Sequence, residues 1–87
     1  MKRWVRIFKS FANENRLSIV KFLSAKGPKS VTDIAQHLDI SFRATSRHLI
    51  LMERFDILRS KGSVGHVFYF LNDEMPDDIR TVMKLFV

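Results

Sequence analysis

The sequence SVTDIAQHLDISFRATSRHLILMERF, residues 30–55, contains two short helical patterns separated by a turn. In the first pattern apolar residues recur three and four positions apart, and Asp33 follows Ser30 at the spacing of a capping box. Ser41 is a good N-cap for the second pattern, so DIS at 39–41 is the turn between the two helices. Two short helices joined by such a turn predict a helix-turn-helix over about 30–55.

Beyond Phe55 the pattern changes from a helical period to an alternating one. ILRSK (57–61) alternates apolar and polar residues, HVFYFLN (66–72) is rich in β-branched and aromatic residues, and GSVG (62–65) lies between them. Two strands around a glycine-rich loop predict a β-hairpin over about 57–72. A hairpin that follows a helix-turn-helix is the wing of a winged helix-turn-helix.

Helical patterns also flank this unit. WVRIFKSFA (4–12) carries a wide apolar stripe, and NENRLSIVKFLS (13–24) repeats the pattern. Near the other end, Pro76 and two aspartates after it predict a last helix over about 76–86. The sequence therefore predicts one domain over residues 1–87, mainly α with a β-hairpin, in the order α-α-α-α-β-β-α.

Composition limits what this chain can be. Its 87 residues are 46% apolar, which suffices for the packed core of one small domain. It has no cysteine, which excludes disulfides and cysteine-based metal or redox sites. No apolar run approaches the roughly 18–20 residues that span a bilayer, and the starting stretch MKRWVRIF is interrupted by Arg6. We therefore expect a cytoplasmic protein with no membrane segment and no signal peptide.

Positive charge is concentrated in the N-terminal third of the sequence. The formal net charge is +6 and the pI is about 10.2, and residues 1–30 carry eight Lys or Arg against one Glu. Residues 73–87 instead carry two Lys or Arg against four Asp or Glu. A small basic domain is a candidate for binding a polyanion such as nucleic acid. A solvated surface that only keeps the protein in solution is the alternative.

Four stretches together resemble the ArsR/SmtB-like winged-helix repressors: FANENRLSIVKFL, SVTDIAQHLDIS, ATSRHLILMERFDIL and GHVFYFLN. They cover about residues 5–72 in the order and spacing of that family. The most specific part is SRHL (46–49), followed eight residues later by IL and then by the wing. The resemblance implies a DNA-binding regulator that recognises an operator in double-stranded DNA. Such regulators are usually homodimers, and usually repressors that a signal releases.

The residues by which many members of this family sense metals are missing. Their Cys-Val-Cys-Asp-Leu pattern is matched here by SVTDI (30–34), and hydroxyls are poor ligands for soft ions. A second family site uses Asp and His on the final helix, where this chain has Asp77 and Asp78 but no histidine after His66. We therefore expect neither a metal site nor a cofactor, and the effector stays unknown. The family's glycine after the recognition helix is Asp56 here, which tolerates a left-handed turn better than most residues.

The helix that begins at Phe42 is expected to enter the major groove with its N-terminal half. Thr45 and Leu49 lie on a row that can face the core, whereas Arg43 and Arg47 lie on the opposite face. Arg can bond guanine with two hydrogen bonds, and Phe42 can contact a thymine methyl group. A phosphate contact or a solvated side chain is the alternative for each arginine.

The wing and the start of the third helix supply further candidates. Such a hairpin can lie along phosphates or enter the minor groove, or it can merely cover the core. A helix N-terminus also favours a phosphate. For the one histidine on the recognition helix, a packed and hydrogen-bonded side chain is the alternative to a contact. The full set of candidate DNA-binding residues is Lys29, Ser30, Ser41, Phe42, Arg43, Thr45, Ser46, Arg47, His48, Arg59, Lys61 and His66.

The first and last helices carry more apolar surface than one small domain needs. In similar proteins these two helices form the dimer interface, and a two-fold axis would place two recognition helices roughly 34 Å apart. Packing within the core is the alternative for each residue. The candidate interface residues are Trp4, Phe8, Phe11, Ile79, Val82, Met83 and Phe86.

These observations predict a dimeric, sequence-specific, double-stranded DNA-binding transcriptional regulator, most simply a repressor that blocks a promoter. The alternative is a winged-helix module for protein–protein interaction, with Ile50 and the aromatic residues as its docking surface. An enzyme is not expected. The sequence shows no Ser/His/Asp set, no paired carboxylates in an obvious cleft and no phosphate-binding glycine loop.

Overall fold

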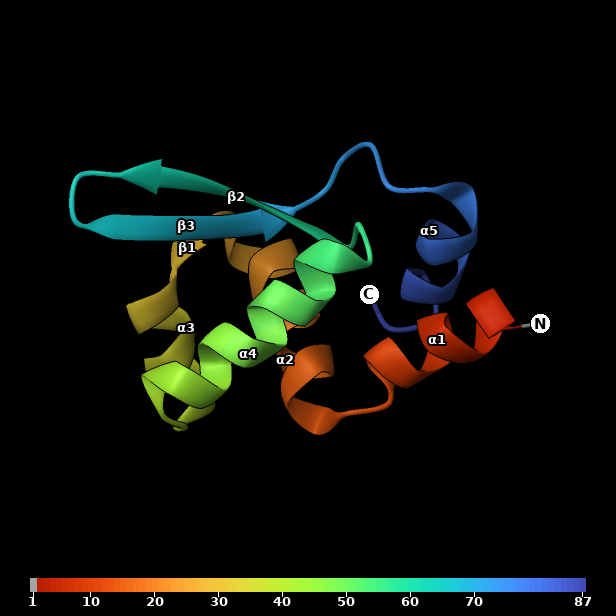
Figure 1. Cartoon of the computed structure of the whole chain (residues 1–87), viewed down its shortest axis with the longest axis horizontal. Coiled ribbons are helices and arrows are strands. Elements are labelled where there is room, and N and C mark those ends of the chain that lie inside the picture. Colours follow the sequence, from red (N-terminus) through yellow and green to blue (C-terminus); the bar gives the residue numbers. More distant parts are fainter. Residues whose placement is uncertain (1) are drawn as a thin grey trace.

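Five helices and three strands make up residues 2–87, the part of the chain that the computed structural model describes (Figure 1). The helices are α1 (Lys2–Phe11), α2 (Glu14–Lys26), α3 (Val31–Leu38), α4 (Phe42–Arg54) and α5 (Asp77–Met83). The strands are β1 (Lys29–Ser30), β2 (Leu58–Ser63) and β3 (His66–Leu71). The β2–β3 hairpin extends from one end of the molecule, and α1 and α5 pack together at the other end. This is the winged helix-turn-helix that the sequence predicts.

Local signals place the helix-turn-helix as expected. The Ser30 Oγ accepts a hydrogen bond from the Asp33 N–H at 3.1 Å, and the Ser41 Oγ accepts one from the Ala44 N–H at 3.0 Å. Both predicted caps are therefore confirmed, because each serine satisfies an amide that the first turn of its helix leaves open. Between the two helices Asp39 has a left-handed backbone with φ 56°, which ends α3 and turns the chain towards α4.

The three strands form an antiparallel sheet in the order β1-β3-β2. The hairpin pairs Leu58 with Leu71 at its base and Ser63 with His66 at its tip. Strand β1 was not predicted, because it has only two residues and pairs with a strand far along the chain. It joins α2 to α3 along the free edge of β3, and so attaches the helix-turn-helix to the wing.

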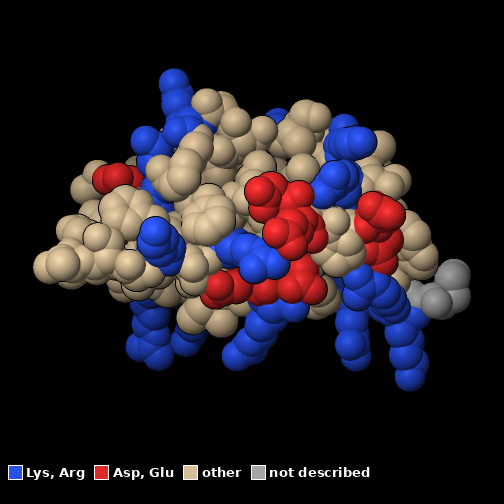
Figure 2. All heavy atoms as spheres, turned by 90° about the horizontal axis from the view of Figure 1, so that it is seen from above, with Lys and Arg blue, Asp and Glu red and all other residues tan. Residues whose placement is uncertain are grey.

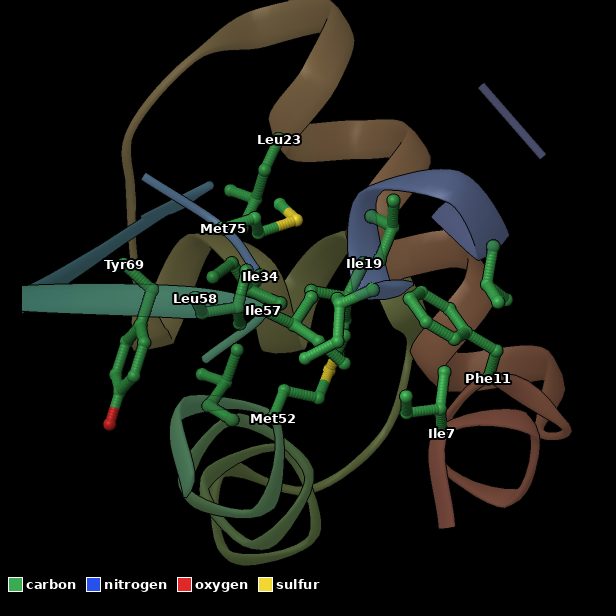
Figure 3. Close-up of a cluster of buried hydrophobic side chains, with 14 of the residues drawn as sticks. Ile7, Phe11, Ile19, Leu23, Ile34, Met52, Ile57, Leu58, Tyr69 and Met75 are labelled. Atoms are coloured by element: carbon green, nitrogen blue, oxygen red, sulfur yellow. The ribbon is translucent and has the colours of Figure 1, made fainter. Parts of the chain in front are cut away.

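The hydrophobic core lies where α2, α3 and α4 meet the sheet (Figure 3). Helix α2 contacts α1, α3, α4 and β3, so it is buried on several sides. Helices α1 and α5 close the core at the end away from the wing. The core residues labelled in Figure 3 are Ile7, Phe11, Ile19, Leu23, Ile34, Met52, Ile57, Leu58, Tyr69 and Met75.

The seven candidate interface residues divide into three groups by their exposure. Phe11, Ile79 and Val82 are 1%, 1% and 2% exposed and belong to the core. The expectation that they contact a partner is corrected, because α1 and α5 each bury one face within the chain itself. Trp4 and Phe8 are 42% and 51% exposed, on the outside of α1. The two remaining candidates, Met83 at the end of α5 and Phe86 just after it, are half-buried.

The last helix ends earlier than the sequence suggests. It stops at Met83 rather than near residue 86, because the chain tightens into turns. In these turns Leu85 N–H donates to the Val82 carbonyl and Phe86 N–H to the Met83 carbonyl, both at 3.0 Å. The Phe86 ring thereby stacks on the Phe11 ring, with centroids 5.8 Å apart. The end of the chain thus packs back onto α1.

Candidate nucleic-acid interface

Helix α4 presents a continuous exposed face to solvent. Leu49 and Met52 are fully buried and hold the helix against the core, because they lie on the row that faces inward. Arg43, Arg47 and Ile50 lie on the opposite side and are exposed, as their spacing predicts. Two of the three are arginines, and they project from the N-terminal half that was expected to meet base edges.

The first turn of α4 adds one exposed aromatic ring and two hydroxyls with different roles. Phe42 is exposed and Ser46 is half-buried, so both can reach a ligand that lies against α4. Thr45 is fully buried instead, and its Oγ1 donates a hydrogen bond to the Ser41 carbonyl at 2.9 Å. Its place as a candidate DNA contact is therefore corrected, because it holds the start of the helix from inside.

His48 is held by an arginine that the sequence analysis did not single out. Arg16 donates through Nε to the Ser10 carbonyl at 2.6 Å and through Nη2 to the Lys9 carbonyl at 2.9 Å. Its Nη1 lies 3.3 Å from His48 Nδ1, which therefore accepts, because a guanidinium can only donate. Burial lowers the pKa of the His48 imidazole, and the Arg16 charge lowers it further. His48 is thus a neutral side chain that joins α4 to Arg16 of α2, which in turn bonds the end of α1.

The candidate residues of the wing lie at different positions between the base and the tip of the hairpin. Lys61 and His66 are exposed towards the tip, where Val64 is 97% exposed in the turn. A groove of about 290 Å³ separates the tip from the start of α4, with Phe42 and His66 among its lining residues. Arg59 lies near the base of the hairpin, where it is bonded to Asn72, so it is a less available cation than Lys61.

Asn72 joins the end of α4 to the end of the wing, and the sequence analysis gave it no role. Its side chain is buried, and its Nδ2 donates to the Asp56 carbonyl at 3.0 Å. Its Oδ1 accepts from Arg59 Nε at 2.8 Å and from the Glu74 N–H at 3.0 Å. Asp56 has φ 61°, so the predicted left-handed turn after the recognition helix is confirmed. The hydrogen bond from the Glu74 N–H to Asn72 Oδ1 forms an Asx-turn. This local pattern could have identified Asn72 from the sequence.

The candidates at the start of α3 are more restricted. Ser30 is buried and its hydroxyl caps α3, as the Ser41 hydroxyl caps α4. Lys29 is half-buried, and its Nζ lies 5.9 Å from the centre of the Phe22 ring. These residues position the helix-turn-helix, and of the three only Lys29 has a charge to offer a phosphate.

Basic side chains gather on one side of the molecule. Seen from above, Lys and Arg side chains project in a row from one long edge, whereas Asp and Glu gather near the middle of the face shown (Figure 2). That edge is the side nearest the viewer in Figure 1, where α4 and α1 lie. The candidate interface on α4 is therefore part of a longer basic edge.

Residues 2–87 contain neither a cluster of metal-ligating side chains nor a membrane-spanning helix. No three His, Asp or Glu side chains in this range lie close enough together to hold a metal ion. Within the same range, no helix combines the length and the apolar character that crossing a bilayer requires.

Comparison with known proteins assigns the chain to a family. The sequence profile described as "Bacterial regulatory protein, arsR family" matches residues 13–60, which include α3 and α4. The chain belongs to the arsR family. This confirms the resemblance that the sequence motifs carry.

Relatives of this arsR-family chain include two curated resistance regulators. The arsenical resistance operon repressor of Escherichia coli (strain K12) is 36% identical over 72 residues, covering 83% of this chain and 62% of the relative. The cadmium resistance transcriptional regulatory protein CadC homolog of Staphylococcus aureus is 30% identical over 69 residues, covering 79% and 57%. The chain thus spans less than two thirds of the length of these relatives.

Solved structures confirm the winged fold of the arsR-family chain. HlyU from Vibrio cholerae N16961 superposes with a TM-score of 0.78 and 27% identity, covering 97% of this chain and 87% of that one. The transcriptional repressor PagR of Bacillus anthracis gives a TM-score of 0.73 and 26% identity, covering 97% and 92%. The likeness extends over nearly the whole chain, including α1 and α5.

Proposed function

We propose that this arsR-family chain is a sequence-specific transcriptional regulator that binds double-stranded DNA as a homodimer, and that it acts as a repressor. The main support is the exposed face of α4, which carries Arg43 and Arg47 and begins at Phe42 in the groove beside the tip of the wing. The family and the names of the relatives agree with this, since those relatives are regulators. A protein with this function works where the chromosome is, so the proposal includes a cytoplasmic location.

In this proposal α4 lies in the major groove and reads base edges from its first two turns. The guanidinium of Arg47 or Arg43 can bond O6 and N7 of a guanine, while the exposed Phe42 ring contacts a thymine methyl group. Ser46 is close enough to the exposed face to add a hydrogen bond. The wing then lies against the backbone or the minor groove through Lys61 and His66. A dimer bound in this way covers a promoter and excludes the polymerase.

Two copies are proposed to meet through the outer sides of α1 and α5. Trp4 and Phe8 form an exposed aromatic pair on α1, with ring centroids 6.3 Å apart. Leu85 and Val87 are exposed just beyond α5, the helix that packs against α1. Exposed apolar side chains that gather in this way are typical of a surface that another chain covers.

Binding to the DNA upstream of the protein's own gene tests the proposal. We expect tight binding at near-physiological salt, and a large preference over scrambled duplex, in fluorescence anisotropy. Replacing Arg47 with Ala is expected to cost about 1–3 kcal/mol of specific binding, because a bidentate contact to guanine is lost. Lys21→Ala is the matched control. It removes an exposed cation from α2, outside α4 and the wing, and should leave operator binding unchanged.

Other outcomes of this experiment point elsewhere. An equal loss on operator and scrambled DNA would reassign Arg47 to a phosphate contact. No binding of the wild type even at low salt would contradict the proposal. It would favour a protein-interaction module, in which the exposed Ile50 is part of the docking surface. Association with a protein partner that does not weaken with salt would support that second reading, because phosphate binding is strongly salt-dependent.

Metal ions are not expected to regulate this protein. The chain has no cysteine, and SVTDI (30–34) offers hydroxyls where metal-sensing members have thiolates. Stoichiometric zinc, cadmium or arsenite should therefore leave operator affinity unchanged in the same anisotropy assay. A several-fold loss of affinity with any of the three would contradict this expectation and would mean that other ligands form a site.

A further inference from the structure

Helix α1 has two exposed flanks of different chemistry. Lys2, Arg6 and Lys9 are spaced four and three residues apart, so they lie along one side of the helix, and all three are exposed. We call this side the basic flank. Trp4 and Phe8, four residues apart, lie along the other exposed side. The apolar side suits a second copy of the chain, which leaves the basic flank without an assigned role.

The basic flank meets the C-terminal end of the recognition helix. A hollow of about 260 Å³ lies between α1 and α4. Its lining residues are Arg3, Arg6, Ile7, Arg54, Phe55 and Asp56. Arginines from two helices that are distant in the sequence therefore face one space.

The charges around this hollow do not cancel. Arg3 is bonded to both carboxylate oxygens of Asp78 on α5, and this contact lowers the pKa of the Asp78 carboxyl. Asp56 supplies one negative charge in the hollow. Neither Arg6 nor Arg54 forms an ion pair with any of residues 2–87. Two exposed guanidinium groups thus face one carboxylate, and the surplus charge is positive.

The same charge continues along α4. Arg43, Arg47 and Arg54 are four and seven residues apart, so they follow one face of the helix from its first turn to its last. All three are exposed. The basic flank and these arginines form a strip of positive charge on α1 and α4, the helices on the edge from which Lys and Arg side chains project in Figure 2. The strip runs along the molecule, whose longest extent is 39 Å.

We propose that Arg6 and Arg54, with the basic flank of α1, bind DNA backbone phosphates that lie between the two half-sites of the operator. This inference rests on the proposed function. The phosphates lie there because α1 is at the end of the chain that faces the second copy, whereas Arg43 and Arg47 are nearer the wing. A guanidinium suits phosphate oxygens, since it offers two parallel N–H groups.

A polyanion fits this strip better than a small free anion. The arginine side chains are exposed, so water and salt compete with any single ion pair there. A DNA strand gains from several such contacts at once, because each neutralised phosphate releases condensed counterions. The hollow therefore serves as one contact point of an extended track.

The salt dependence of binding measures these contacts. With Arg6→Gln and with Arg54→Gln, the plot of log affinity against log salt concentration should become shallower by about 0.9 per lost phosphate. The loss of affinity should be similar on operator and scrambled duplex, because phosphates carry no sequence information. Lys26→Gln is the matched control in the C-terminal half of α2, which lies behind α4 in Figure 1, and it should keep the wild-type slope.

Two further experiments determine where on the DNA the contact lies and whether the phosphate belongs to DNA or to a free anion. On an operator with neutral methylphosphonates between its half-sites, Arg6→Gln should no longer weaken binding. Pyrophosphate at constant ionic strength should bind wild type and Arg6→Gln equally in calorimetry. Two results would overturn this inference without affecting the proposed function. One is a wild-type salt slope in both variants. The other is a pyrophosphate site in the wild type that Arg6→Gln abolishes. Failure of the wild type to bind operator would overturn the proposed function and this inference with it.

Discussion

Changing Trp4 and Phe8 together to Asp is expected to weaken operator binding by a factor on the order of 100 or more. The two rings are exposed and adjacent on α1, so the change places two charges in the proposed dimer interface. A monomer binds only one half-site of the operator. In a dimer the first bound copy holds the second copy near the other half-site at a high effective concentration, and a monomer loses this gain. That linkage raises avidity by roughly 10²–10⁴. Analytical ultracentrifugation and anisotropy on the same samples measure both effects.

The controls separate dimerisation from folding. Both side chains are on the surface of the chain, so circular dichroism should show an unchanged helix content in the double variant. The combination of Trp4→Phe and Phe8→Leu keeps the surface apolar and should remain a dimer with near wild-type affinity. A double-aspartate variant that still sediments as a dimer would show that the two copies meet elsewhere. A wild-type monomer that binds operator tightly would remove the need for a dimer.

The parts of the fold that the sequence predicts are those with local causes. Ser30 and Ser41 cap the helices that follow them, because an N-cap needs only the next three amides. Asp56 adopts the left-handed turn after α4, since a short polar side chain tolerates positive φ. The exposure of Arg43 and Arg47 follows from helical spacing relative to the buried Leu49. In each case the interacting groups lie within a few residues of one another.

The parts that it does not predict depend on contacts between distant segments. Arg16 reaches His48 across 32 positions, and nothing beside Arg16 in the sequence distinguishes it from the exposed arginines of the chain. The apolar stripe of α1 predicts an interface position for Phe11, which is instead buried in the core, because such a stripe does not say which chain covers it. Thr45 was expected to serve both the core and the DNA, and only its hydrogen bond inside the chain decides between them.

Asn72 is expected to have the largest effect on stability of any polar residue near the interface. Its amide bonds Asp56, Arg59 and Glu74, and it is 3% exposed. Asn72→Ala removes this buried amide and all three of its hydrogen bonds. We expect the free energy of unfolding to fall by about 2–4 kcal/mol, since three hydrogen bonds with a net contribution of roughly 0.5–1.5 kcal/mol each are lost. Urea denaturation followed by circular dichroism measures the change.

Two neighbouring variants show which of these bonds matters. Asn72→Asp keeps the acceptor for Arg59 and Glu74 but loses the donor to the Asp56 carbonyl, so it should destabilise less than Asn72→Ala. Asp73→Ala changes the next, exposed side chain and should stay within about 0.5 kcal/mol of the wild type. A loss below about 1 kcal/mol for Asn72→Ala, at an unchanged denaturant slope, would show that water replaces the amide. The hairpin would then be held to α4 mainly by apolar contacts and by the hydrogen bond from Ser60 Oγ to Glu53 Oε2.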